Sequence, residues 1–301
     1  MCGPPENGYT SQMRRIATDG YLPLLPNNTT FNKDLIDLCT THKPDMIFLQ
    51  VQAPGIIDPI ALKQCKDLGT VIFNFNGDIR EVLPSWHYDI APYCDSMLFT
   101  NMLDVRRIRQ AGFVSDWLEL GFDPERYKTW PNIPVDRDVI AHFNHYGSFP
   151  LSQYRLQIAE RLRSEFGNNF AVYGTFPGAA GNLNSDQIEE SKNYMRAKIA
   201  INCSHFSVPK YSSDRLSRIM GTGGPMCLSH HFDDMGSLYE IGKHWDVFHD
   251  LDELVRKCRY YLSNDDLRQK IAKDGQQHAL NNYTFEKMAE NIKSLYQKYK
   301  K

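Results

Sequence analysis

The sequence lacks several features that would assign a function class directly. No apolar run approaches the roughly 20 residues of a membrane span, and the N-terminus has neither the basic region nor the apolar core of a secretion signal. It contains no Walker lysine loop, no G-x-G-x-x-G and no G-x-S-x-G. The net charge of −2 gives no support to a polyanionic partner held by bulk electrostatics.

Metal-binding patterns are also missing. The seven cysteines are an odd number and include no C-x-x-C and no Cys/His cluster with the spacing of a zinc site. The D-x-D of Asp136-Arg137-Asp138 lies at the start of an expected strand, whereas a metal-binding pair would follow one. We therefore expect no metal site, and buried thiols in a reducing cytoplasm.

What the chain does have is an alternation of short apolar runs with helical patterns of about 10–15 residues. This alternation predicts parallel strands joined by right-handed helical crossovers in doubly wound α/β sheets. The expected strands are 22–25, 46–51, 70–75, 97–100 and 114–120, and then 138–143, 170–173, 199–203, 226–228 and 245–248. The chain opens with a loop-like segment and a helical pattern over 9–17, so we expect the first strand of the first sheet to be missing.

At 301 residues the chain is long enough for two cores. The best linker is the stretch 127–137, which contains Pro131 and Pro134 and has no clear period. We predict an N-terminal domain over 1–130, a C-terminal domain over 138–284, and a final helix over 285–301 with an apolar stripe that must pack on another surface.

The most informative stretch is Ile199–Ser229, which reads as strand, polar loop, helix, glycine turn and strand. Ser212 or Ser213 can cap the helix, and Lys210, Asp214 and Arg215 lie where the strand ends and the helix begins. Ligands collect at this edge of a parallel sheet because helix N-termini offer free N–H groups. The pattern predicts a site for a phosphate-bearing ligand, and an ordinary loop with solvated charges is the alternative.

Three other motifs follow expected strands. Asn76-Gly77-Asp78-Ile79-Arg80 offers Asp78 as a general base or hydroxyl-binding group, or else forms an Asp–Arg pair that shapes a turn. Gly147-Ser148 permits close approach of a phosphate to the backbone, or else makes a plain turn. Tyr173-Gly174-Thr175 is a candidate for holding a base or a ribose, and His205 is expected near the ligand edge.

Together these segments resemble the two-domain GT-B glycosyltransferases, and within them the spore-maturation-protein-like or glycosyl transferases group 1-like family. The similarity covers about residues 70–295. The segments that carry it are Gly77-Asp78-Ile79-Arg80, 93–101, 120–127, Ser213-Asp214-Arg215, Gly221-Thr222-Gly223-Gly224, 252–254, 260–262, Ile271-Ala272, Gly275 and Tyr283-Thr284-Phe285.

The resemblance implies an α/β protein with two Rossmann-like domains and a nucleoside-diphosphate sugar in the cleft between them. The C-terminal domain would hold most of this donor, with Gly223 and Gly224 in the donor-site turn and no metal requirement. The final helix would cross back to the N-terminal domain. A UDP-sugar is the donor that we expect.

The sequence departs from the related retaining enzymes at Arg218, where those enzymes have the glutamate of an R-x-x-E motif. A guanidinium cannot accept hydrogen bonds from sugar hydroxyls, so Ser213 and Asp214 become candidates for these contacts.

We therefore expect a metal-independent hexosyl- or pentosyltransferase whose acceptor is a hydroxyl of a glycan, a small molecule, a protein or a modified DNA base. Arg215, Lys210, the amides of Gly147-Ser148 and the helix N-terminus near Ser213 would stabilise the departing diphosphate. Asp78 is the candidate base if the reaction inverts, and it would orient the acceptor or the donor sugar if the reaction retains configuration.

Three alternatives stay open at this point. The first is a catalytically silent GT-B module that binds a sugar or a partner. The second is a phage-type enzyme that glycosylates modified DNA bases, with a basic cleft lined by Arg106, Arg107 and Arg109. The third is a sugar-phosphate epimerase on the same fold.

Overall fold

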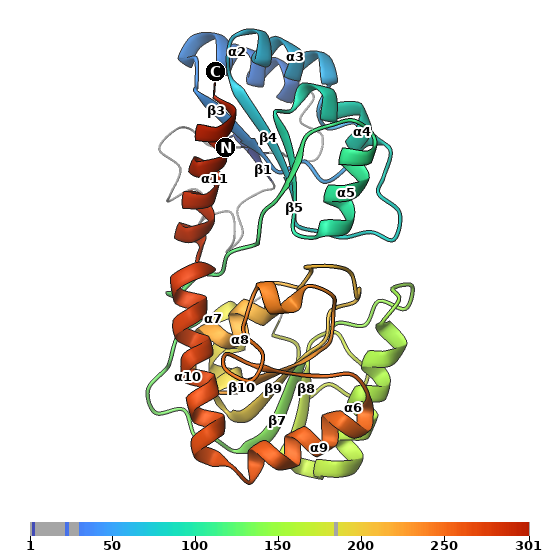
Figure 1. Ribbon diagram of the computed structural model, residues 1–301, viewed down its shortest axis with the longest axis vertical. Coiled ribbons are helices and arrows are strands. Elements are labelled where there is room, and N and C mark those ends of the chain that lie inside the picture. Colours follow the sequence, from blue (N-terminus) through green and yellow to red (C-terminus); the bar gives the residue numbers. More distant parts are fainter. Residues whose placement is uncertain (1, 4–21, 24–29, 184–185, 301) are drawn as a thin grey trace. The chain divides into compact units, whose positions relative to one another are not determined.

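The computed structural model describes residues 2–3, 22–23, 30–183 and 186–300. The chain divides into two compact units, Met1–Leu120 with Phe285–Lys301, and Gly121–Thr284. Each unit contains one parallel sheet with helices on both faces (Figure 1). In the described part of the chain, no helix is long and apolar enough to cross a membrane.

The first unit is built on a parallel sheet in the order β2-β1-β3-β4-β5-β6. Its strands are β1 (Cys2–Gly3), β2 (Leu22–Pro23), β3 (Met46–Leu49), β4 (Val71–Asn76), β5 (Ser96–Phe99) and β6 (Ser115–Trp117). Every residue of β4 is buried, as expected for a central strand covered on both faces.

Alternate residues of these strands face two different helical layers. One layer consists of α2 (Phe31–His42), α3 (Pro59–Asp67), α4 (Trp86–Ile90) and α5 (Met102–Gln110). The other face packs against α11 (Phe285–Tyr299), whose apolar stripe contacts Phe73 and Phe75 (Figure 1). The end of α11 is held by Asp116 of β6, which accepts hydrogen bonds from the Tyr299 hydroxyl at 2.6 Å and the Lys298 ammonium at 2.9 Å.

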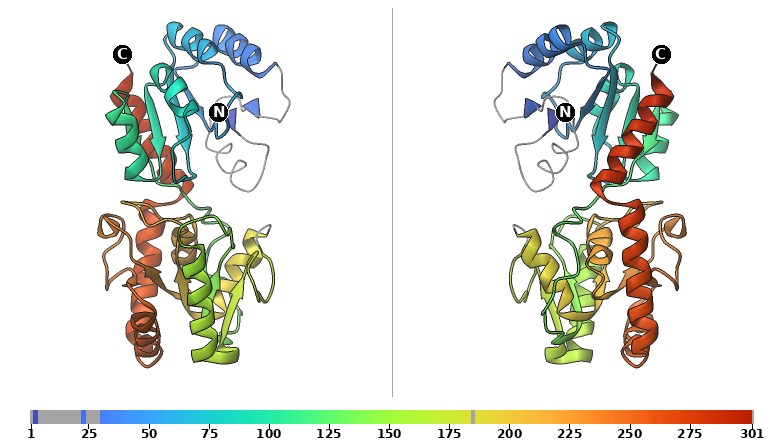
Figure 2. Two further views of the ribbon diagram at one scale, coloured as in Figure 1. Left: turned by 90° about the vertical axis from the view of Figure 1, so that its right-hand side faces the viewer. Right: turned by 90° about the vertical axis from the view of Figure 1, so that its left-hand side faces the viewer.

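The second unit has a parallel sheet in the order β11-β10-β9-β7-β8. Its strands are β7 (Arg137–His142), β8 (Phe170–Tyr173), β9 (Ala197–Asn202), β10 (Met226–His230) and β11 (Asp246–Phe248). The helices are α6 (Ser152–Phe166), α7 (Gln187–Met195), α8 (Arg215–Thr222), α9 (Leu251–Leu262) and α10 (Asp265–Asn282). Helices α6 and α9 lie on one face of the sheet, and α7, α8 and α10 lie on the other (Figures 1 and 2). Because all strands are parallel, their carboxyl ends share one edge, and the loops at that edge form the candidate site.

The expectation that the first sheet lacks its first strand is wrong. Cys2–Gly3 forms a strand between β2 and β3, with Cys2 opposite both Leu22 and Leu49. Two residues are too few to produce a readable apolar pattern, which is why the sequence did not reveal it. The helix expected over 9–17 lies outside the described residues.

The boundary predicted over 127–137 differs from the division in the structure, which falls after Leu120. The stretch around Tyr127 is anchored on α7, since the Tyr127 hydroxyl donates to Glu190 at 2.5 Å and the Trp130 indole donates to Ser191 at 3.0 Å. Prolines indicated a linker, but the buried aromatic side chains attach this stretch to the second unit.

Candidate functional site

The loops after β7 and β8 continue side by side beyond the ends of their strands. The amide of Phe143 donates to the carbonyl of Tyr173, and the amide of His145 donates to the carbonyl of Thr175, both at 2.8 Å. Gly174 has φ +108°, and a Cβ there would lie 2.3 Å from the carbonyl oxygen of Phe143. Gly174 is therefore required by the approach of the two loops, whatever they bind.

The loop after β9 joins the same edge. The amide of Leu151 donates to the carbonyl of His205 at 3.0 Å, and the amide of Ser213 donates to the hydroxyl of Ser204 at 3.0 Å. His205 also packs against the rings of Tyr146 and Phe149, with centroids 5.1 and 5.2 Å away. Three loops that are far apart in sequence thus form one surface around His205 and the start of α8.

Arg155 of α6 lies beneath these loops and is 1% exposed. Its guanidinium donates to the carbonyls of Cys203 and Asn144, at 2.8 and 2.9 Å, and contacts Nε2 of His205 at 2.7 Å. Burial and the neighbouring Arg215 lower the pKa of Arg155 to about 9. Among the described residues it forms no ion pair, so its charge is buried against neutral groups, namely backbone carbonyls, the His205 imidazole and the Phe143 ring.

Arg215, the first residue of α8, is the second guanidinium at this edge. It donates to the Ser213 hydroxyl at 3.0 Å and lies 6.0 Å from the centroid of the Phe143 ring, which Arg155 also faces at 5.1 Å. No carboxylate of the described residues pairs with Arg215, and the side chain of Asp214 does not cap α8. Within the described residues, Arg155 and Arg215 thus bring positive charge to a helix N-terminus, and neither of them forms an ion pair with a carboxylate.

Two histidines at this edge, His142 and His205, have lowered pKa values. Burial, Arg215 and Arg218 lower the pKa of His142 to about 3. Burial, Arg155 and Arg215 lower the pKa of His205 to about 3. Both imidazoles are therefore neutral near neutral pH.

Several buried polar atoms at this edge have no hydrogen-bond partner among the described residues. They are Nε2 of His142, Nδ1 of His145 and Oδ1 of Asn202, at or just beyond the carboxyl ends of β7 and β9. Buried polar groups in proteins are normally satisfied, so unsatisfied ones at a sheet edge favour a ligand site.

Arg218, at the position where the resemblance described above implies a glutamate, belongs to a separate buried cluster. Its guanidinium pairs with Asp214 at 2.5 Å and with Glu190 at 3.5 Å, and it lies 5.3 Å from the centre of the Tyr127 ring. Glu190 also accepts hydrogen bonds from the hydroxyls of Tyr127 and Tyr194. Arg218 thus holds α8 to α7, and Asp214 is already engaged by an ion pair.

The remaining residues predicted for this edge lie in its loops. Gly147 and Ser148 are exposed in the turn before α6. Lys210 lies in the loop after β9 and has a positive φ of +54°. Its amide donates to the carbonyl of Asp233 at 2.8 Å, and this hydrogen bond connects the loop after β9 to the loop after β10. Tyr173 is partly buried and stacks on His142 with centroids 5.4 Å apart.

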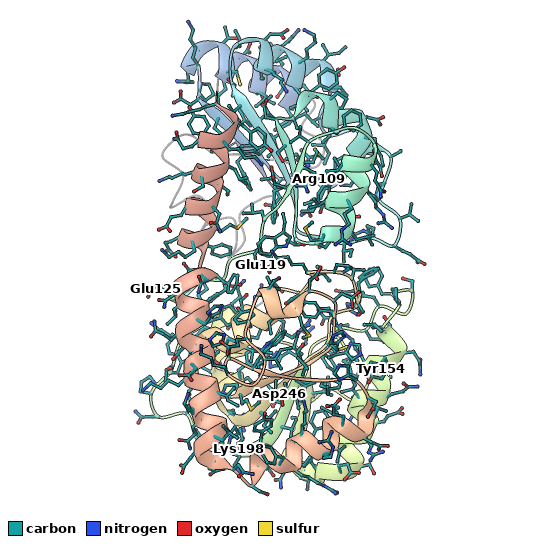
Figure 3. All side chains as sticks on the ribbon, viewed as in Figure 1. Arg109, Glu119, Glu125, Tyr154, Lys198 and Asp246 are labelled. Atoms are coloured by element: carbon teal, nitrogen blue, oxygen red, sulfur yellow. The ribbon has the colours of Figure 1, made fainter. Side chains whose placement is uncertain are left out.

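Gly223 and Gly224 do not join this edge. They follow the eight residues of α8, about 12 Å from its start, and precede β10, so they lie at the opposite, amino edge of the sheet. A Cβ on Gly223 would meet Gln276 at 2.3 Å, and one on Gly224 would meet Met195 at 2.4 Å. The absence of side chains there serves close packing. They line a separate open cavity of about 600 Å³ with Lys198, which is labelled in Figure 3.

In the first unit, Asp78 follows β4 and its side chain is about half exposed. Its amide donates to Oδ1 of Asn76 at 3.0 Å, and its carboxylate lies 3.4 Å from the Arg80 guanidinium. The turn is shaped by Asn76 and by the bond from Thr100 to the Gly77 carbonyl at 3.1 Å, and not mainly by the exposed Asp–Arg pair. The Asp78 carboxylate is thus accessible to solvent.

The arginines proposed for a DNA-binding cleft have other partners. Arg107 pairs with Asp104 at 2.8 Å, and Arg109 lies 3.6 Å from Asp116 and donates to the carbonyl of Ser115. Arg107 is thus paired with a buried carboxylate, and Arg109 shares Asp116 with Lys298, so these two arginines give the modified-base alternative no support.

Sequence reasoning missed Arg155, Phe143, His142 and Glu190 as parts of the site and its support. Arg155 lies inside a helical pattern, where a charged residue is normally read as solvated. The spacing of residues in α6 was a usable signal. Arg155 lies on the same helical face as Ser152 and Ile158, three positions from each, and all three are buried.

Comparisons with known proteins support the fold. Residues 155–294 match the family model described as glycosyl transferase-like. The crystal structure of Anabaena Alr3699/HepE in complex with UDP and glucose superposes with a TM-score of 0.66, at 11% identity, covering 98% of this chain and 91% of that one. A glycosyltransferase from Rickettsia africae ESF-5 gives a TM-score of 0.69 at 10% identity, covering 99% and 89%.

Sucrose-phosphate synthase from Thermosynechococcus elongatus gives a TM-score of 0.56 at 10% identity, covering 93% of this chain and 82% of that one. No curated protein sequence matches the chain. At these identities the structural likeness establishes the fold, with two parallel α/β sheets as in the GT-B proteins.

Proposed function

We propose that the chain, which has the GT-B fold, is a glycosyltransferase that transfers a sugar from a UDP-sugar to an acceptor hydroxyl. The observation that carries the proposal is the pair of guanidiniums, Arg155 and Arg215, without carboxylate partners among the described residues at the carboxyl edge of the second sheet. A diphosphate supplies the anion that this edge lacks.

UDP is the nucleotide that the relatives favour. HepE has been crystallised with UDP and with UDP-glucose, and the pneumococcal O-GlcNAc transferase GtfA has been crystallised with UDP and GlcNAc. For this chain, Tyr173 and Thr175 are our candidates to contact the base or ribose, because they follow β8 at the same edge.

In the proposed reaction the bond between the anomeric carbon and the diphosphate oxygen breaks, and the electron pair stays on the diphosphate. The acceptor oxygen forms the new bond to the anomeric carbon and loses its proton. Arg215 is placed to stabilise the departing charge, together with the start of α8 and the loop residues Gly147, Ser148 and Lys210. Ser213 orients Arg215 through its hydroxyl.

We propose Asp78 as the base that takes the acceptor proton, because it presents an accessible carboxylate at the carboxyl end of β4. We further propose that transfer needs no metal, since protein guanidiniums provide the positive charge at the diphosphate. Undiminished transfer in EDTA is the expected result, and loss of transfer that Mg²⁺ or Mn²⁺ restores would refute this part.

Thermal unfolding with a panel of nucleotides and nucleotide-sugars tests the donor. A ligand at about 100 times its Kd adds about 2.7 kcal/mol to the unfolding free energy, which is a readily measured shift in Tm. We expect a shift with UDP and with one UDP-sugar, and a smaller one with ADP, GDP and their sugars. A shift with none of them would overturn the proposal.

A further inference from the structure

We propose that Arg155 is a positioning residue that holds His205 in a single neutral tautomer, so that the Nδ1–H of His205 donates a hydrogen bond to the donor's diphosphate. This inference rests on the proposed function for the identity of the ligand. The state of the imidazole itself can be tested without any ligand.

The tautomer follows from which group can donate. Nη1 of Arg155 lies 2.7 Å from Nε2 of His205, and a guanidinium has donors only. Nε2 must therefore offer its lone pair, which leaves the ring proton on Nδ1. The carbonyl of Asn144 also lies 3.0 Å from Nε2 and accepts from Arg155 at 2.9 Å. A proton on Nε2 would place two donors against each other across the 2.7 Å contact with Arg155, which favours the tautomer with the proton on Nδ1.

The surroundings of His205 also oppose its protonation. Arg155 approaches it from α6 and Arg215 from α8, and His145 and Tyr146 face it from the loop after β7. No carboxylate contacts the ring among the described residues. A cationic imidazole would stand beside two guanidiniums, whereas a neutral one accepts a bond from the first of them.

Arg155 is suited to this task because it is buried and hydrogen-bonded on several sides. It is 1% exposed and is held by the carbonyls of Cys203 and Asn144, which lie in the loops after β9 and β7. It therefore links both loops to the imidazole that they share. A merely structural Arg155 would tie the loops together without determining where the histidine carries its proton.

The direct test is ¹⁵N NMR of the histidine side chains in the free, full-length protein. We expect His205 to show a protonated Nδ1 and an unprotonated Nε2, with no titration down to about pH 5. A proton on Nε2, or a titration near the ordinary pKa of about 6.5, would overturn the inference and leave the donor proposal untouched. His205→Gln assigns the signal.

A second test asks whether His205 acts as a neutral donor. Binding of UDP-glucose is measured from about pH 5.5 to 8, because the diphosphate of a nucleotide-sugar has no proton that titrates there. We expect a Kd that is flat with pH in the unmodified protein. His205→Gln, which keeps an N–H, should bind within about threefold, and His205→Phe should lose about tenfold, the value of one hydrogen bond to a charged group. Equal losses in both variants would refute the donor role.

The third test removes the positioning group. In Arg155→Met, the pKa of His205 measured by NMR should rise, because Arg155 is gone while burial and Arg215 remain, and affinity for UDP-glucose should improve as the pH falls toward that pKa. Arg155→Lys should restore the flat profile at least in part. A flat profile in Arg155→Met, with the fold verified by its Tm, would show that Arg155 is only structural.

If this buried variant does not fold, the NMR result and the two His205 variants still decide the question. Absence of UDP-glucose binding in the unmodified protein, with the tautomer as expected, would instead count against the proposed donor.

Discussion

Replacing Arg215 with alanine should weaken donor binding without weakening the fold. The only hydrogen bond of the Arg215 side chain within the described residues goes to the Ser213 hydroxyl at 3.0 Å. Removing the Arg215 side chain therefore leaves no carboxylate without its partner. It also removes a positive charge that lowers the pKa of the buried Arg155. The free energy of unfolding should therefore stay constant or rise slightly, as is common where a residue serves a ligand at some cost in stability.

The loss in affinity can be estimated from the bonds that a guanidinium makes to a phosphate. A hydrogen bond to a charged group contributes about 1.5–3 kcal/mol, so Arg215→Ala should raise the Kd for UDP by about 10- to 150-fold. Titration calorimetry measures the Kd, and a thermal melt without ligand measures the stability of the same sample.

Arg161→Ala is the matched control in the same unit. Arg161 is also partly exposed, but it pairs with Glu165 and Asp252 on the outer surface of α6 and α9. We expect this control to bind UDP within about twofold of the unmodified protein. Unchanged UDP affinity in Arg215→Ala, or equal losses in both variants, would refute the reasoning.

Three further predictions follow from the same structure. Arg218→Ala should lower the free energy of unfolding by about 2–3 kcal/mol in denaturant titrations, because it leaves two carboxylates unpaired in a mostly buried cluster; an unchanged midpoint would contradict that role. Asp78→Asn should reduce kcat about 100-fold and leave the donor Kd within twofold, and equal changes in both would exclude a base. His142, His205 and His230 have pKa values lowered by burial to about 3, 3 and 4. The unfolded chain binds protons below about pH 6.5 and the folded chain does not, so Tm should fall as the pH drops from about 6.5 to 4, and a flat Tm would contradict it.

The order of strands and helices could be predicted because each element has a clear period and a clear end. Strand β8, for example, has the same bounds as its prediction from sequence, 170–173. The two-residue strand β1 could not be predicted, because its pairing with β3 depends on residues almost fifty positions away. The attachment of residues 127–130 to α7 was hidden for the same reason, since it depends on Tyr127 reaching Glu190.

The candidate site was predictable in its location but not in its composition. The position of Arg215 after a strand and at a helix start indicated an anion site, and the structure brings the Gly147-Ser148 and Thr175 loops to the same edge. Gly223 and Gly224 were assigned to that edge by resemblance, but the length of α8 carries them to the other one. The contribution of Arg155 depends on burial and on its contact with His205, which no spacing rule reveals.

The measurement that tests the central claim most directly is a crystal structure of the full chain with UDP. The account predicts that the diphosphate lies at the carboxyl edge of the second sheet, within hydrogen-bond distance of the Arg215 guanidinium and near His205. Diphosphate density at the opposite edge, in the cavity that Lys198 and Gly223 line, or on the first unit would contradict it.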